Sequence, residues 1–143
     1  MAIPFRFETV LRVRQAERDR YHLALVQEQQ RAVEIQAECN RVSTERLAML
    51  AELRAMHDSG DWPADRALAR QQHAEHLATE LTRLDAVLRD ATASLTRCRC
   101  ELLEADTSVK ALEKLAGRHE SDQRRSEEAS AEQDREETWR AAS

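Results

Sequence analysis

Large aromatic side chains are scarce in this sequence. The 143 residues include two Phe, two Trp and one Tyr, and aromatic residues make up only 3% of the chain. A thick globular core normally needs several such side chains, which bury the largest areas. The scarcity therefore argues against a compact globular fold. A mixture dominated by Ala, Arg, Glu, Leu and Gln is instead typical of long helices that share a thin apolar seam.

Glycine and proline are equally rare, with two residues of each. Two isolated glycines cannot build a phosphate-binding loop, so nucleotide chemistry of that kind is excluded. No Ser/His/Asp or Cys/His arrangement is visible either, and long helices offer no concave pocket to house one. We therefore expect a single domain over residues 1–143 that is not an enzyme and holds no cofactor.

Long apolar runs are missing too, since no stretch of 18 or more apolar residues occurs. The beginning of the sequence lacks the basic-then-apolar pattern of a secretory signal, and we expect a cytoplasmic protein. Cys39, Cys98 and Cys100 are odd in number and fit reduced cytosolic thiols better than a disulfide scaffold. The net charge of −5 disfavours nucleic acid as the main partner.

What the sequence does contain is a seven-residue apolar repeat, which makes helices supercoil around a partner. In the first half, the positions that repeat from Phe7 and from Leu11 are apolar at eleven of fifteen places up to Met56. The four exceptions are Arg14, Arg18, Glu28 and Arg46. Long charged side chains can cover such a seam with their stems while their heads reach water. The first helix therefore has the less complete apolar seam, and we call it the leakier one.

The second half has a cleaner repeat. The positions that repeat from Leu77 to Leu112 and from Leu81 to Ala116 are all apolar, twelve in number. The pattern then stops at His119 and Gln123. The balance of 22 basic against 27 acidic residues, together with this periodicity, argues against a disordered chain.

A turn separates the two halves, where Gly60 and Pro63 form the one close Gly/Pro pair. Gly suits a helix C-terminus and Pro the first turn of the next helix. We predict an all-α fold in which two long helices, over about 5–57 and 64–137, form an antiparallel coiled-coil hairpin around a turn at 58–63. The longer second helix would leave a charged overhang. Gly117 would mark a kink or the start of a looser tail, and the order of residues 118–143 stays open.

Two histidines of the second helix have the spacing of possible metal ligands. His73 and His76 are spaced i,i+3, and Glu80 follows four residues later, so a zinc site could start this way. His57 is expected nearby across the hairpin. Further ligands are unidentified, and two surface histidines near the turn are the simpler interpretation. We expect no metal.

Three stretches resemble one family. Residues Phe5–Arg14 place an aromatic, a basic residue, an aromatic and a Val-Leu pair as at the start of FliJ-type flagellar export proteins. Pro63–Asp65 with Gln71–Leu77 is similar to the family's start of helix two, and Val109–Leu115 resembles its late Lys-Leu-Glu-Lys-Leu stretch. The resemblance covers nearly the whole chain. The related stalk proteins of injectisomes share the fold, and the choice between the two systems stays open.

The resemblance implies a specific role. FliJ-type proteins are cytoplasmic components of the flagellar type III export apparatus, at the cytoplasmic face of the inner membrane. Their paired helix ends insert into the hexameric export ATPase and promote its assembly and activity. They also contact the export gate protein FlhA and export chaperones. A generic structural or scaffolding coiled coil that homodimerises is the alternative.

Carried onto this chain, the resemblance and the hairpin geometry give two candidate surfaces. The residues expected to bind the ATPase are Phe5, Arg6, Phe7, Arg118, Arg124, Arg125 and Arg135. The residues expected to bind the export gate are Leu50, His73, Leu77, Glu80 and Leu84. Leu77 and Leu84 are also seam positions, and a purely structural role that holds the hairpin shut is the competing interpretation for both.

Overall fold

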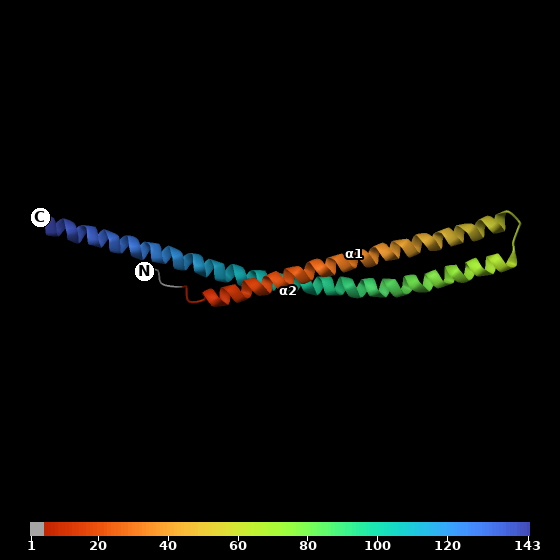
Figure 1. Ribbon diagram of the computed structural model, residues 1–143, viewed down its shortest axis with the longest axis horizontal. Helices are drawn as coiled ribbons and strands as arrows, with labels where there is room; N and C mark the ends of the chain where they lie inside the picture. The colour runs from red at the N-terminus through yellow and green to blue at the C-terminus, as the bar shows by residue number, and fades with distance from the viewer. Residues whose placement is uncertain (1–4) are drawn as a thin grey trace. The chain divides into compact units, whose positions relative to one another are not determined.

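The computed structural model describes residues 5–143, so the first four residues lie outside this description. Two helices account for nearly all of it, α1 (Glu8–Asp58) and α2 (Ala64–Ala142), and residues 5–143 contain no strand (Figure 1). The prediction of an all-α helical hairpin is confirmed. Neither helix contains a stretch long and apolar enough to cross a membrane.

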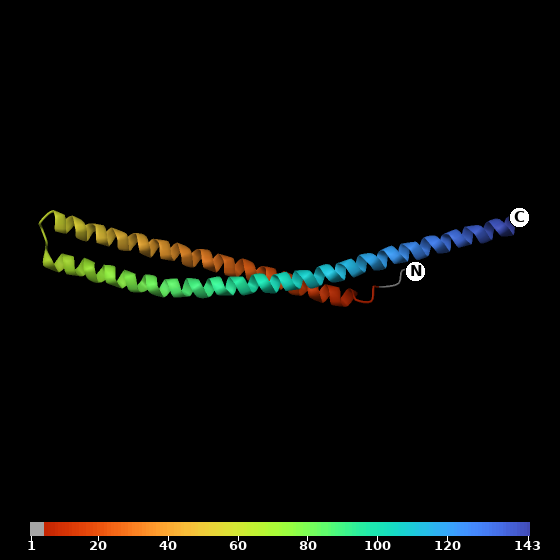
Figure 2. The same cartoon turned by 180° about the vertical axis from the view of Figure 1, so that it is seen from behind.

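The chain separates into two compact units. The hairpin unit comprises Ala24–Arg99 and holds the later part of α1, the turn and the first part of α2. The terminal unit comprises residues 5–23 together with Cys100–Ser143. Within the hairpin unit, the two helices lie side by side and antiparallel, as both ribbon views show (Figure 1, Figure 2).

The core of the hairpin unit is a thin seam. Val42 of α1 is 1% exposed and packs with Leu77 and Leu84 of α2, each of which is 5% exposed. Three half-buried side chains, Cys39, Met49 and Leu81, surround this cluster. All six residues occupy positions of the seven-residue repeat, because a two-helix contact can bury only the stripe that each helix turns toward the other.

The clean repeat of α2 is buried along its whole length. Each of its twelve seam positions from Leu77 to Ala116 is buried or half-buried, and Ala91 and Val109 are fully buried within their respective units. The polar residues that follow at the same spacing, His119 and Gln123, are also half-buried. Partial burial therefore continues past the last apolar residue of the pattern.

The charged exceptions of α1 behave in two ways. Arg18, Glu28 and Arg46 are half-buried at seam positions, and the packing of their long stems covers even Oε2 of Glu28 and Nε of Arg46. Arg14 is exposed, and its Nη1 lies 3.0 Å from Oε2 of Glu17 on the same helix. The expectation that α1 is the leakier helix agrees with this pattern.

Gly60 makes the turn between the helices possible. Its φ of 74° is in the left-handed region, which glycine adopts without steric cost. The backbone N–H of Ser59 donates to the carbonyl of Ala55, and that of Gly60 donates to the carbonyl of His57. Helix α2 starts at residue 64, and the carbonyl of Pro63 accepts the first helical bond from Ala67.

The ends of the helices differ from the expected ranges. Helix α1 begins at Glu8 instead of residue 5, because residues 5–7 form a turn in which the N–H of Glu8 donates to the carbonyl of Phe5. Phe7 accordingly is 40% exposed and does not enter the seam. Helix α2 continues to Ala142 and passes through Gly117, which keeps a φ outside the left-handed region. The Ala-, Glu- and Arg-rich sequence after Gly117 favours helix strongly enough to extend it without a seam.

A charge placed in the seam tests its location. Leu95→Asp should unfold much of the hairpin, because Leu95 is half-buried at a seam position and an unpaired carboxylate is costly there. Leu103→Asp is the matched control, since Leu103 is 67% exposed on the same helix. Circular dichroism should show a large loss of helix and a lower melting temperature for the first variant. Equal behaviour of the two variants would show that the seam is misplaced.

Candidate functional site

The first residues of the terminal unit form a small aromatic cluster. The rings of Phe5 and Phe7 meet edge to face with centroids 5.9 Å apart, and the guanidinium of Arg6 lies 5.5 Å from the centre of the Phe7 ring. The Phe5 ring also lies 5.7 Å from the ring of His119 on α2. Aromatic and cation–π contacts of this geometry are favourable. They fix the start of the described chain against α2 and leave Arg6 exposed.

Beside this cluster, the two helices enclose an open hollow. It is lined by residues at and just before the start of α1 and by residues within the second half of α2: Phe5, Glu8, Leu11, Ala116, His119, Glu120 and Gln123. The lining mixes apolar side chains with carboxylates, as expected for a surface that meets a protein rather than a small apolar ligand. Of the predicted ATPase-binding residues, Phe5 lines this hollow, whereas Arg6 and Phe7 belong to the aromatic cluster beside it.

The remaining predicted ATPase-binding residues lie on α2, with Arg118 beside the hollow and the other three after it. Arg118, Arg124, Arg125 and Arg135 are all exposed, and every residue from Arg124 onward is exposed. Arg135 lines a shallow depression beside Trp139, whose side chain is 74% exposed. A large exposed indole with a neighbouring guanidinium is the kind of pair that anchors protein contacts. The sequence thus places cations and one aromatic anchor on a helix with no packing of its own.

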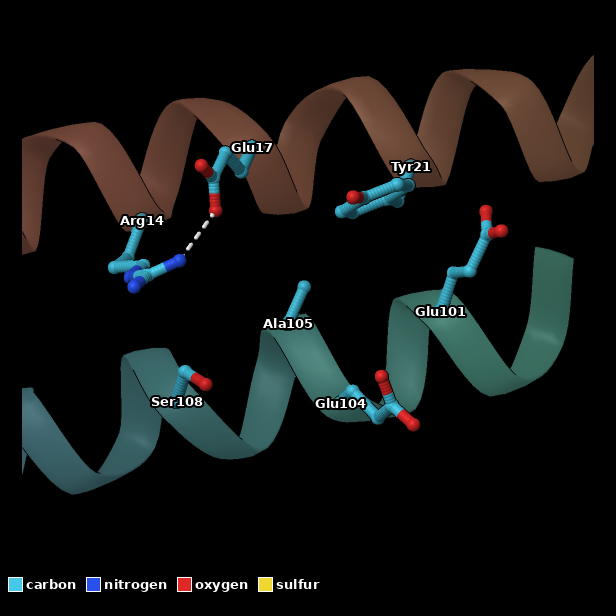
Figure 3. Close-up of a pocket in the computed structure, with 7 residues that line it drawn as sticks. All are labelled: Arg14, Glu17, Tyr21, Glu101, Glu104, Ala105 and Ser108. Atoms are coloured by element: carbon cyan, nitrogen blue, oxygen red, sulfur yellow. Dashed lines mark hydrogen bonds and ion pairs between the residues drawn. The ribbon is translucent and has the colours of Figure 1, made fainter.

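A second groove of the terminal unit is acidic. It measures about 160 Å³ and is lined by Arg14, Glu17, Tyr21, Glu101, Glu104, Ala105 and Ser108 (Figure 3). The Arg14–Glu17 ion pair closes one end of the groove, and the Tyr21 ring lies between the two helices. The groove can accept a basic side chain of a partner through carboxylates and an aromatic face. It offers no nucleophile paired with a base.

The predicted gate-binding residues belong to the hairpin unit. Leu77 and Leu84 are part of its buried core, so most of their surface already faces α1. His73 and Glu80 flank this core and are half-buried, whereas Leu50 on α1 is exposed. The structure therefore brings the four α2 residues together on the face that packs against α1. The surface left for a partner consists of Leu50 and the edges of His73 and Glu80.

Polar side chains flank the core and pair both across the hairpin and within each helix. His73 Nε2 lies 3.1 Å from Oε1 of Glu45, and Arg70 hydrogen-bonds Glu52 across the hairpin. Arg41 pairs with Glu38 at 2.6 Å and with Glu45 at 3.3 Å, while Arg83 pairs with Glu80. Exposed pairs contribute little stability one by one. The two pairs that cross the hairpin mark which residues of α1 and α2 face each other.

Two carboxyl groups of this network have perturbed pKa values. The hydrogen bond from Arg41 lowers the pKa of Glu38 below its usual range, although loss of surrounding water opposes the change. The hydrogen bond from Arg83 lowers the pKa of Glu80 in the same way, and the charges of His76 and Arg41 add to it. Arg41 lies on α1, so this contribution acts across the hairpin. Both carboxylates are therefore held in their charged form.

The histidines near the turn do not assemble a metal site. Residues 5–143 contain no group of three His, Cys, Asp or Glu side chains arranged to hold a metal ion. His73 is hydrogen-bonded to Glu45. The ring of His57 packs edge to face on the Trp62 ring, with ring centroids 6.1 Å apart. The three cysteines are free thiols.

Helix α1 carries a further exposed apolar surface that the sequence pattern of the seam does not predict. Val26, Val33 and Leu47 are 47%, 62% and 62% exposed on α1, although they are large and apolar. They lie on the side of α1 that faces away from the seam. The signal was present in the seven-residue spacing of Val26 and Val33, because residues one position after the seam line share an outer face.

The carboxylate network predicts a loss of stability in acid. A carboxyl group whose pKa is lowered in the folded state stabilises the fold above its unfolded pKa, and this contribution disappears as pH falls. The double variant Glu38→Gln/Glu80→Gln should therefore lose less thermal stability than the natural sequence when pH is lowered from neutral to below about 4. Thermal melts by circular dichroism measure the difference.

The control for this experiment is Glu127→Gln/Glu128→Gln, which removes the same number of carboxylates from the exposed part of α2. It should follow the acid response of the natural sequence. If both double variants respond alike, the network does not determine the acid stability of the hairpin unit.

Comparison with known proteins adds one finding. A protein-family model described as "Flagellar FliJ protein" matches residues 3–136, nearly the whole chain. No curated protein and no solved structure matches.

Proposed function

We propose that this chain, which belongs to the flagellar FliJ protein family, acts as the stalk of the hexameric flagellar export ATPase. Membership of the family makes it a non-catalytic component of the flagellar protein export apparatus. The proposed stalk role is more specific than this family membership. In this role the terminal unit inserts into the ATPase ring, promotes assembly of the hexamer and raises its rate of ATP hydrolysis.

The observation that supports this role most directly is the form of α2 at its C-terminal end. The helix continues to Ala142, and every side chain from Arg124 onward is exposed. A helix of this length without an apolar stripe gains little from packing within the chain, and stability for such a helix usually comes from tertiary contacts. An enclosing ring of a partner would supply those contacts.

The charge pattern fits the same role. Arg124 and Arg125 are followed closely by Glu127 and Glu128, so both signs alternate along the exposed segment. Mixed surface charges give orientation and speed of association more than affinity. The aromatic cluster at Phe5 and Phe7 would enter the ring beside this segment.

The hairpin unit is the proposed contact for the export gate protein FlhA, and export chaperones are further proposed partners. Leu50, His73 and Glu80 retain the accessible surface for such a contact, whereas Leu77 and Leu84 would act by supporting the face from within. Binding to these partners would hold the chain at the cytoplasmic face of the inner membrane, through proteins alone.

The proposal is tested by mixing the purified chain with the flagellar export ATPase. The chain should increase ATP turnover and the fraction of hexamer, as measured by phosphate release and by sedimentation. Arg124→Ala/Arg125→Ala should weaken both effects and leave the helix content unchanged, because the two side chains are exposed and form no part of the seam.

The matched control is Arg97→Ala/Arg99→Ala, two exposed arginines of the hairpin unit. This variant should stimulate the ATPase as well as the natural sequence does. Unchanged ATP turnover and unchanged hexamer formation with the natural sequence would contradict the stalk role and favour a scaffolding coiled coil.

A further inference from the structure

An uncharged stripe runs along the outer face of α1 within the hairpin unit. Its eight residues are spaced alternately by four and three positions and are all exposed. This spacing keeps them in one line along a helix. We call them the outer stripe: Val26, Gln30, Val33, Ala37, Asn40, Thr44, Leu47 and Ala51.

The absence of charge from the outer stripe is unusual for this chain, in which 34% of residues are charged. Helix faces that meet only water are normally rich in charged side chains. The corresponding line on α2, from Leu68 to Ala93, does carry charges at Glu75 and Arg89. The contrast within one unit indicates that the outer face of α1 is adapted to contact a surface other than water.

The side chains of the outer stripe suit close packing of a second helix. Val33 and Leu47 supply apolar area and are each 62% exposed. Ala37, Thr44 and Ala51 are small and permit a close approach of two helix backbones. A helix with an apolar line facing its intramolecular partner and an uncharged line facing outward can join a larger helical assembly without opening its own hairpin.

The charges beside the outer stripe identify the partner. On one edge the residues at seven-residue spacing are Gln27, Glu34, Arg41 and Ala48, so only Glu34 and Arg41 are charged. The opposite edge consists of Gln29, Gln36, Ser43 and Leu50, without charge. A surface with one acid and one base placed symmetrically about its middle is complementary to itself when two copies meet antiparallel about a two-fold axis.

We propose that the outer stripe binds the outer stripe of a second copy of this chain, in an antiparallel pair with two-fold symmetry. In the register that this symmetry favours, Val26 packs on Ala51, Gln30 on Leu47, Val33 on Thr44 and Ala37 on Asn40 of the other copy. Glu34 of each copy then lies beside Arg41 of the other, and no like charges face each other along either edge.

Contacts within each copy already position the side chains of Glu34 and Arg41. Arg41 bonds to Glu38 and Glu45 of its own helix, and Glu34 accepts a hydrogen bond of 3.2 Å from the side-chain amide of Gln30. Both charged groups are thereby held close to the helix surface. An arginine can donate to several acceptors at once, so Arg41 can add Glu34 of the second copy without releasing its own partners.

The size of the stripe sets the strength of the pair. Eight mostly short side chains give a contact well below the roughly 1,600 Å² of a standard protein–protein interface. The dimer should therefore be weak and dependent on concentration. It would leave the seam of each hairpin uncovered, so it goes beyond the stalk role and does not depend on it.

Sedimentation equilibrium of the full chain, over concentrations from micromolar to millimolar, tests this proposal. The natural sequence should shift from monomer to dimer within this range. Val33→Lys should weaken the association roughly tenfold or more, because it replaces an apolar contact by a charge in the interface. Its helix content should be unchanged, since Val33 does not touch the seam and lysine is a good helix former.

Thr82→Lys is the matched control, because Thr82 is an exposed β-branched residue on the outer line of α2. This variant should associate as the natural sequence does. A monomer at every concentration, or equal association of the Val33→Lys variant and the natural sequence, would overturn the proposal. Weakening by Thr82→Lys to the same extent would place the interface elsewhere and overturn it as well.

Exchange of the two charges tests the antiparallel register. Glu34→Lys alone should weaken the dimer, because it brings two cations together. Adding Arg41→Glu to the same chain should restore association, since the pair is re-formed with reversed signs. Failure of the double variant to regain association, with its helix content intact by circular dichroism, would exclude the register proposed here.

Discussion

The packing of Val42 against Leu77 and Leu84 is the contact on which the hairpin unit depends. Few other side chains of this unit are buried as fully, because two helices alone can shield only one stripe from water. The arrangement of the other side chains of the hairpin unit follows from that contact. It sets which residues of α1 face α2, it places Glu45 opposite His73, and it determines which side of α1 is left outside.

The thinness of the seam explains how the chain can present so much surface. A globular domain of this length would bury many more side chains and would leave binding to a few loops. Here both helices expose most of their residues along their length, and each stretch offers a different chemistry. The acidic groove beside Tyr21, the charged end of α2 and the uncharged outer stripe are separate surfaces on the same two helices.

Several positions show where an apolar pattern is a sufficient guide and where it is not. All twelve repeat positions of α2 are buried or half-buried, because a sustained heptad allows one packing face only. Phe7 follows the pattern of α1 but lies before the helix begins, and there its ring turns toward Phe5 and Arg6 instead. His119 and Gln123 break the apolar pattern and are nevertheless half-buried, because Phe5 and Leu11 of the terminal unit lie beside them.

The sequence by itself determined the helices, the turn at Gly60 and the seam, because periodicity and backbone preference are local properties that neighbouring residues encode. It also carried the family membership, since the match extends along nearly the whole chain. Only the tertiary structure decided which of the predicted binding residues are exposed. Leu77 and Leu84 are buried, whereas Val33 and Leu47 are exposed to water, because exposure depends on what the opposite helix covers. His73 is hydrogen-bonded to Glu45 of the opposite helix.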